Sequence, residues 1–428
     1  MPNSPTPHPH ERWILWVLAG IQFSHIVDFM IMMPLGPQIT RQFGIGDAAF
    51  GFLVSSYTWA AAISGLVASA YVDRFDRKRL LLVLFVAFSV ATLGCAVAWS
   101  YASLVAARIA TGLFGGVLSA LVQTMVAELI PFERRGRAMS VILSAFSLAT
   151  VVGVPASLFI AAWSSWHMPF VAIAVFGLLL CAVAWRVLPR MRGHLQGPER
   201  PAIRAMLASV LADVNHRWAF LFSALMMFTG FAVIPYITIY LQTNVGLNAQ
   251  QVPLIYLFGG AATLFTARWI GRLSDRHGKV RVFTGLAAFV VLPLQVLTHL
   301  PPVALPWVIA LNTVMFVVLS GRMIPGMALV GASANPAVRG SFMAINSAVQ
   351  SLSMGAAAFL GGLIISRDAQ GLVQDYGWNA VLGGAASLLS IWVVRRLVVR
   401  DPSTSTSTST STSTSTSTST STSSQAKP

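Results

Sequence analysis

Long apolar runs, separated by short polar segments, occupy almost the whole chain. Each run extends over about twenty residues, the length that a helix needs to cross a hydrocarbon core of roughly 30 Å. This pattern predicts an all-α integral membrane protein with twelve transmembrane helices. The predicted spans are residues 13–34, 49–71, 80–99, 103–127, 138–163, 168–188, 218–241, 252–271, 282–299, 305–330, 342–365 and 378–394.

The polar segments divide the chain into two sets of six spans. We predict a cytoplasmic tail, an N-terminal bundle, a cytoplasmic linker, a C-terminal bundle and a Ser/Thr tail, at residues 1–12, 13–188, 189–216, 217–400 and 401–428. The last segment alternates Ser and Thr, so it buries no apolar surface that would offset the entropy of ordering it. We therefore expect that tail to be disordered.

Composition supports a membrane protein and excludes a soluble one. The chain is 56% hydrophobic and 10% charged, with a mean hydropathy of +0.72, whereas soluble domains carry about 25% charged residues. Cys95 and Cys181 lie inside apolar runs, where we expect buried thiols rather than a disulfide. The sequence shows no Cys/His spacing typical of a metal site and no glycine-rich nucleotide loop.

The net charge of +15 has a topological explanation. Most of the 28 Lys and Arg residues gather in alternate loops, and the remaining loops keep only Arg41 and Arg367. Loops rich in Lys and Arg stay on the cytoplasmic side of a membrane. We therefore predict an inner or plasma membrane protein with both termini in the cytoplasm. The same distribution argues against a nucleic-acid surface.

A short charged loop occurs twice. The sequence Asp-Arg-Phe-Asp-Arg-Lys-Arg at 73–79 and Asp-Arg-His-Gly-Lys at 275–279 align at an offset of 202 residues, from Asp73 to Asp275. The same offset aligns Gly44 with Gly246. A duplicated segment in a chain this apolar predicts a transporter built from two related, pseudo-symmetric six-helix bundles.

These features resemble the major facilitator superfamily, whose loop motif reads Gly-x-x-x-Asp-Arg-x-Gly-Arg-Lys. The second loop follows that motif closely, whereas Ser69 and Asp76 replace both glycines in the first loop. The first loop and the stretch 28–35 resemble twelve-span proton-coupled exporters of the arabinose-efflux-permease type. The matching residues are Gly271, Asp275, Arg276, Gly278 and Lys279 in the second loop and Asp73, Arg74, Arg77 and Lys78 in the first.

The repeated loops suggest a gate between the two bundles. A carboxylate at the end of one helix is favourable near the positive N-terminus of another, and Asp73 is placed for that role with Arg77 and Glu128 as ion-pair neighbours. The alternative is that these charges only fix the topology. The predicted gate residues are Asp73, Arg74, Arg77, Glu128, Gly271, Asp275, Arg276, Gly278 and Lys279.

Charges inside the spans point to proton coupling, because intramembrane charge is costly and usually functional. Asp28 shares one helix face with Gln22 and His25, which predicts a polar stripe toward a central cavity. Burial there disfavours the ionised carboxylate, as a proton carrier requires. Arg108 begins an Arg-x-x-x-Gly pattern that the resemblance associates with proton coupling. Arg322 begins a second one, although either arginine alone would also satisfy backbone carbonyls.

Further polar side chains in the spans are candidates for a substrate cavity. Each one alone is as compatible with a contact between helices. In span five, a Gly-Val-Pro sequence at 153–155 only partly follows the glycine-proline motif of exporters, so it is equally compatible with a simple proline kink. The candidate cavity residues are Gln22, His25, Tyr57, Gln123, Tyr236, Tyr240, Tyr256, Asn312, Arg322, Asn346 and Gln350.

We interpret the chain as a monomeric secondary transporter and not an enzyme. The favoured function is proton-coupled export of a small amphipathic compound or sugar by alternating access, with the proton gradient as energy source and no cofactor. The alternatives are an uptake symporter or uniporter and, more remotely, a membrane sensor. A sensor would need a folded output domain that the linker and tail do not supply. The expected partners are the small-molecule substrate and the lipid bilayer.

Overall fold

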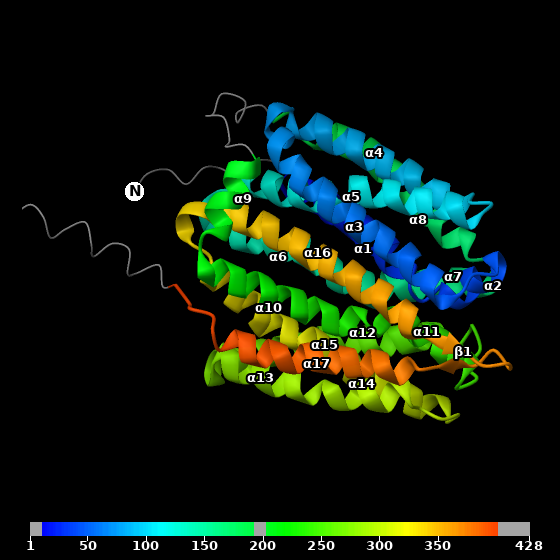
Figure 1. Cartoon of the computed structure of the whole chain (residues 1–428). Helices are drawn as coiled ribbons and strands as arrows, with labels where there is room; N and C mark the ends of the chain where they lie inside the picture. Colours follow the sequence, from blue (N-terminus) through cyan, green and yellow to red (C-terminus); the bar gives the residue numbers. More distant parts are fainter. Residues whose placement is uncertain (1–10, 192–202, 401–428) are drawn as a thin grey trace, which may run out of the picture.

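The computed structural model describes residues 11–191 and 203–400, which form two helical bundles (Figure 1). The first bundle consists of α1 (Glu11–Ile31), α2 (Gly36–Phe43), α3 (Asp47–Tyr71), η1 (Val72–Arg74), α4 (Arg77–Ala96), α5 (Tyr101–Leu129), α6 (Phe132–Leu148), η2 (Ala149–Gly153), α7 (Val154–Trp163) and α8 (His167–Val187).

Helix α9 (Ile203–Leu211) precedes the second bundle. That bundle consists of α10 (Val214–Phe231), α11 (Ile234–Thr243), α12 (Val252–His277), α13 (Lys279–Phe289), α14 (Val291–Thr298), α15 (Leu305–Ser333), η4 (Pro336–Val338), α16 (Arg339–Ile364), β1 (Ser366–Arg367), β2 (Val373–Gln374) and α17 (Tyr376–Val394).

Twelve helices within the described residues are long and apolar enough to cross a membrane, which confirms the predicted number of spans. The hydropathy pattern did not reveal that several crossings are interrupted. The first crossing breaks between Ile31 and Gly36, and the seventh breaks between Phe231 and Ile234. Hydropathy reports how well a segment partitions into lipid, so it is insensitive to a turn of chain buried between helices.

The two ends of the molecule differ in what they contain. We call the end that holds α9, the start of α1 and the end of α17 the linker end (Figure 1). We call the opposite end, with α2 and the β1–β2 hairpin, the distal end. The antiparallel hairpin pairs Ser366 with Gln374 and Arg367 with Val373, and it joins α16 to α17.

The two bundles pack against each other mainly through α3 and α16, which lie side by side (Figure 1). Glycines allow this close approach: a Cβ on Gly355 would lie 2.5 Å from Thr58 Oγ1, and one on Gly362 would lie 2.5 Å from the backbone oxygen of Asp47. Ser55 Oγ also donates a hydrogen bond of 2.7 Å to the Gly355 carbonyl. Smaller contacts join α12 to α7 and η2, and α11 to α2.

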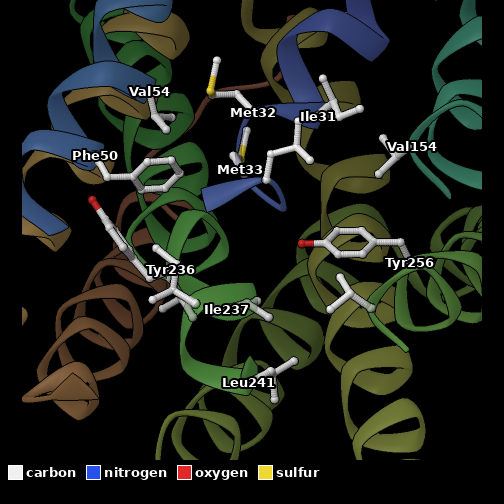
Figure 2. Packing of buried hydrophobic residues seen from close by; sticks show 14 of the residues in the cluster. Ile31, Met32, Met33, Phe50, Val54, Val154, Tyr236, Ile237, Leu241 and Tyr256 are labelled. Atoms are coloured by element: carbon white, nitrogen blue, oxygen red, sulfur yellow. The ribbon is translucent and has the colours of Figure 1, made fainter. Parts of the chain in front are cut away.

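The buried apolar residues show that the bundles meet most closely at the distal end. One cluster contains residues of both bundles, including Ile31, Phe50 and Tyr236. Figure 2 shows Phe50 and Tyr236 facing each other across the boundary, with their ring centroids 6.1 Å apart. Toward the linker end the core divides into two clusters, and each has its fully buried residues in one half of the chain.

Helix α9 lies inside the segment that the sequence predicted as a plain linker. It packs on α3 of the first bundle and on α10 and α16 of the second. Its Met206 and Val210 join the apolar cluster of the second bundle, against which Leu66 of α3 also packs. The linker therefore contacts both bundles where they adjoin at the linker end. The predicted Ser/Thr tail lies outside the described residues, as do residues 1–10 of the N-terminal tail, whose last two predicted residues begin α1.

The predicted orientation has a simple test. Ser165 lies at the distal end between α7 and α8, and Ser424 lies in the C-terminal tail. With single cysteines at these positions, membrane-impermeant thiol reagents should label position 165 from outside the cell and position 424 only from the cytoplasm. Buried Cys95 and Cys181 provide a low background. Labelling of both positions from the same side would contradict the twelve-span topology.

Candidate functional site

A buried ion pair lies in the middle of the first bundle. Arg108 of α5 places Nη1 2.9 Å from Asp28 Oδ2 on α1, and the same nitrogen lies 3.3 Å from the Asp28 backbone oxygen. The two side chains are 1% and 0% exposed. Taking two charges out of water is expensive and rarely improves stability over apolar packing. A pair retained at this depth is therefore best explained by function.

Neighbouring helices complete the surroundings of this pair. Thr92 of α4 donates from Oγ1 to Asp28 Oδ1 at 3.1 Å, so each carboxylate oxygen has a donor. The guanidinium of Arg108 lies 4.4 Å from the ring centroid of Tyr57 on α3. Arg108 Nε and the Tyr57 hydroxyl have no hydrogen-bond partner within the described part of the chain. Both oxygens of the Asp28 carboxyl group thus have a donor, whereas part of the Arg108 guanidinium has no acceptor within the described residues.

Glycines on α5 bring the ring of Tyr57 to the ion pair. A Cβ on Gly112 would lie 2.3 Å from the Tyr57 backbone oxygen, and one on Gly116 would lie 2.4 Å from that of Ala61. Helix α3 can therefore approach α5 only because both positions lack a side chain. The Arg-x-x-x-Gly pattern thus combines a charge for Asp28 with the small residue that admits Tyr57.

The three residues of the predicted polar stripe differ in exposure: Asp28 is buried, whereas Gln22 and His25 are partly exposed. Asp28 is fully enclosed between α1, α4 and α5. Gln22 donates to Ser119 of α5 at 3.0 Å, and His25 lies against Phe88 of α4 with ring centroids 6.2 Å apart. Gln22 and Asp28 thus have hydrogen-bond partners on α4 and α5, whereas Nδ1 of His25 has none among the described residues. Access to Asp28 then requires a different arrangement of the bundles.

The second bundle also contains a buried arginine, Arg322. This arginine is 1% exposed and donates to the Met226 backbone oxygen at 2.6 Å and to Ser387 Oγ at 3.3 Å. Its contact with α10 parallels the contact of Arg108 with the α1 backbone, but no carboxylate faces it among the described residues. The repeat offset aligns Asp28 with Gly230. Among the described residues, the buried acidic side chains all lie in the first bundle.

The remaining candidate cavity residues are mostly engaged in packing. Tyr236 donates to the Ala358 carbonyl, and Asn312 donates to its own helix. The Tyr236 contact therefore ties α11 to α16, whereas the side-chain oxygens of Asn312 and Asn346 are buried without a hydrogen-bond partner among the described residues. Tyr240 Oη donates to the Leu300 carbonyl, Tyr256 Oη lies 3.1 Å from Thr238 Oγ1, Gln350 lies near Met327 Sδ, Asn346 is buried, and Gln123 is exposed.

The predicted ion-pair neighbours Arg77 and Glu128 form an ion pair within the first bundle. Arg77 at the start of α4 donates from Nη2 to Glu128 Oε1 of α5 at 3.1 Å, and its side chain is 2% exposed. Because both residues belong to the first bundle, this pair cannot by itself hold the bundles together. Asp73 lies in η1 and Arg74 is exposed; the side chain of Asp73 is outside what the structure describes.

The two loops of the repeat turn differently. Gly278 has a φ of +88°, which favours glycine. Its counterpart Asp76 has a φ of −58° and caps α4, accepting from the backbone nitrogens of Lys78 and Arg79. A cap therefore replaces the glycine turn in the first loop. In the second loop Asp275 and Lys279 form an exposed pair of 3.8 Å, Arg276 is exposed, and Gly271 has open space around it.

An ion pair that the sequence did not predict joins the bundles at the distal end. Arg367 of the hairpin donates from Nε and Nη2 to both oxygens of Asp47, at 2.7 and 2.8 Å. These hydrogen bonds raise the pKa of the Arg367 guanidinium. The side chain of Asp47 is 3% exposed. The sequence indicated Arg367 only as a rare basic residue in an outer loop, because 320 positions separate it from its partner.

Together, the twelve spans, the two bundles and the buried ion pair describe a polytopic membrane protein of the secondary-transporter type. The family model described as Major Facilitator Superfamily matches residues 18–358, with a second match at 269–425. The chain belongs to the major facilitator superfamily. It is thus a multi-pass membrane transporter and not an enzyme, and the predicted fold class is confirmed.

Solved structures share this fold at low sequence identity. A bacterial homologue of the human lysosomal transporter Spinster, in an inward-facing and unoccupied conformation, has a TM-score of 0.72 at 15% identity, covering 94% of this chain and all of that one. A D-xylose–proton symporter has a TM-score of 0.72 at 18% identity, covering 91% and 98%. The nucleoside transporter NupG has a TM-score of 0.73 at 11% identity, covering 90% and 99%.

The proposed gate role of Asp73 leads to a transport prediction. Asp73→Asn should leave the protein folded and inserted but lower transport, because a carboxylate near a helix N-terminus contributes a fraction to about 2 kcal/mol. Flux at matched expression measures the effect, and Asp275→Asn, at the equivalent position of the exposed second loop, shows whether that loop contributes to the gate equally. Wild-type flux in the Asp73 variant would reduce this carboxylate to a topology charge.

Proposed function

We propose that this transporter is a proton-coupled exporter of the twelve-span arabinose-efflux type that moves a small amphipathic compound or sugar. The observation that carries the proposal is the enclosed pair of Asp28 and Arg108. The residue Asp28 is the proton-carrying group, and Arg108 stabilises its ionised form. The energy source is the proton gradient, the working unit is a monomer, and the linker end faces the cytoplasm.

Protonation of Asp28 breaks its ion pair with Arg108. Protonation of Asp28 cancels its charge and leaves Arg108 buried without a counter-ion. Breaking a buried pair by removing one charge costs roughly 3–5 kcal/mol. Protonated Asp28 is therefore unfavourable in this conformation. Protonation favours a different conformation, in which other groups compensate the charge of Arg108. Proton binding and conformational change are linked through that cost.

The division of the core supports alternating access. The bundles share apolar packing at the distal end and have separate cores toward the linker end. Opening the distal end would separate Phe50 from Tyr236 and break the contact of Asp47 with Arg367. Protonation of Asp28 from the outer side and release inward would then return the exporter for the next substrate.

A proton-flux screen tests this function and identifies a substrate in the same experiment. Everted membrane vesicles carry an acidic interior that a fluorescent amine reports, and compounds are added from drug, sugar and amino-acid-derivative sets. An exported compound should dissipate the gradient in wild-type vesicles but not in vesicles with Asp28→Asn. If every compound that the wild type transports moves equally well in the variant, the proposed coupling is wrong.

A further inference from the structure

Two phenylalanines at equivalent positions of the repeat touch each other between the bundles. The rings of Phe29 and Phe231 have centroids 6.0 Å apart and planes 26° apart. The offset of the duplicated loops, from Asp73 to Asp275, also aligns Phe29 with Phe231. The contact therefore lies where the pseudo-symmetry relates α1 to α10.

A continuous series of planar groups connects this contact to the buried ion pair. Phe29 also stacks on Tyr57, with ring centroids 5.2 Å and planes 28° apart. Tyr57 in turn lies under the guanidinium of Arg108 at 4.4 Å. Such cation–ring and ring–ring contacts are attractive at these distances. From Asp28 to the second bundle, each group thus touches the next.

The series ends at the two helix interruptions. Phe29 lies two residues before α1 ends at Ile31, and Phe231 is the last residue of α10. Interrupted helices concentrate the backbone changes of a rocking motion in a few residues. A shift of either ring therefore acts at the points where each bundle can bend.

The surroundings of the Tyr57 hydroxyl indicate that hydrogen bonds do not fix this side chain in one position. The side chain is buried, yet its oxygen has no hydrogen-bond partner within the described residues. Ring contacts thus decide where this side chain rests, and the strongest of these depends on the Arg108 charge. The repeat aligns Asp28 with Gly230, and the buried acidic side chains of the described residues lie in the first bundle, so the signal starts there.

We propose that Tyr57 and Phe29 are positioning residues that transmit the protonation state of Asp28 to the second bundle through Phe231. The inference rests on the proposed role of Asp28 as the proton carrier. When Asp28 becomes neutral, Arg108 leaves its carboxylate and Tyr57 follows. The stack of Phe29 on Phe231 then changes, and the two helix breaks move together.

Two substrate-free measurements on the purified full-length protein test this inference. Infrared difference spectra against pH report the carboxylic-acid band of Asp28, assigned by its loss in Asp28→Asn. Spin labels at exposed Arg137 and His277, at the linker ends of α6 and α12, report the separation of the bundles. We expect Phe29→Leu to keep the Asp28 band. In the spin-label distances, pH changes the ratio of the population with separated bundles to the population with adjoining bundles, and the variant should reduce this change by about fivefold or more.

Matched variants separate transmission from general damage. Phe52→Leu removes another ring between the bundles, one that contacts Phe359 at 6.2 Å, and it should preserve the pH response. Phe29→Tyr keeps the stacked ring and should therefore show the pH response of the wild type. A wild-type response in Phe29→Leu overturns this inference and leaves the proposed function standing. Absence of any Asp28 band in the wild type overturns both.

Discussion

Replacing Asp28 by Asn is expected to abolish proton-driven accumulation while substrate exchange across the membrane continues. Asn resembles the protonated acid, so the protein can no longer cycle between the paired and neutral forms of the site. Removal of a positioned proton-transfer group commonly costs about a hundredfold or more in rate. Exchange needs no proton cycle, and we expect it to fall much less.

The variant also leaves Arg108 buried without its counter-ion, which costs stability as well as coupling. A double variant, Asp28→Asn with Arg108→Gln, removes both charges and should unfold at a higher temperature than the single variant. Gradient-driven transport should stay absent in both. Proteoliposomes with an imposed pH gradient, compared at matched protein content, measure this directly. Full accumulation in Asp28→Asn would remove the acid from the mechanism.

Reversing the distal charge of Arg367 should shift the transporter toward a conformation open at the distal end. Arg367→Glu replaces two charge-assisted hydrogen bonds to Asp47 with repulsion. Hydrogen bonds to charged groups contribute roughly 1.5–3 kcal/mol. That range corresponds to about tenfold to a hundredfold in the ratio of the two conformations.

The reciprocal variant provides the control. Asp47→Arg combined with Arg367→Asp restores opposite charges and should recover part of the closed population. Recovery should be incomplete, because Asp47 also begins α3, where an acidic residue is favourable and a basic one is not. The accessibility of cysteine probes at the distal end measures the fraction of molecules that are closed there. If Arg367→Glu and the swapped pair are equally accessible, the ion pair does not control distal opening.

The helices could be predicted from the sequence because their cause is local. Twenty apolar residues cross a bilayer as helix whatever surrounds them, and all twelve spans were found that way. The importance of Asp28 and Arg108 was also visible, since a charge inside an apolar run is conspicuous without a structure. That Arg108 reaches Asp28 from a helix 80 residues away needed the fold.

The rest depended on contacts between the bundles. The pair of Asp47 with Arg367 and the stack of Phe29 on Phe231 join residues that no local pattern relates. The repeat offset does align the two phenylalanines, but an aromatic pair among many apolar residues gave no signal until the structure placed them in contact. Arg77 belongs to a loop motif that the sequence associated with a gate between the bundles. In the structure its ion pair with Glu128 joins α4 to α5 inside one bundle.

Proton release by the purified protein tests the central claim most directly. The claim is that the carboxyl group of Asp28 carries the transported proton. Wild-type protein in weakly buffered detergent solution, on addition of a substrate found in the vesicle screen, should release protons that a pH-sensitive dye detects. Asp28→Asn should bind the same substrate without any release. Proton release of wild-type size from that variant would contradict the account.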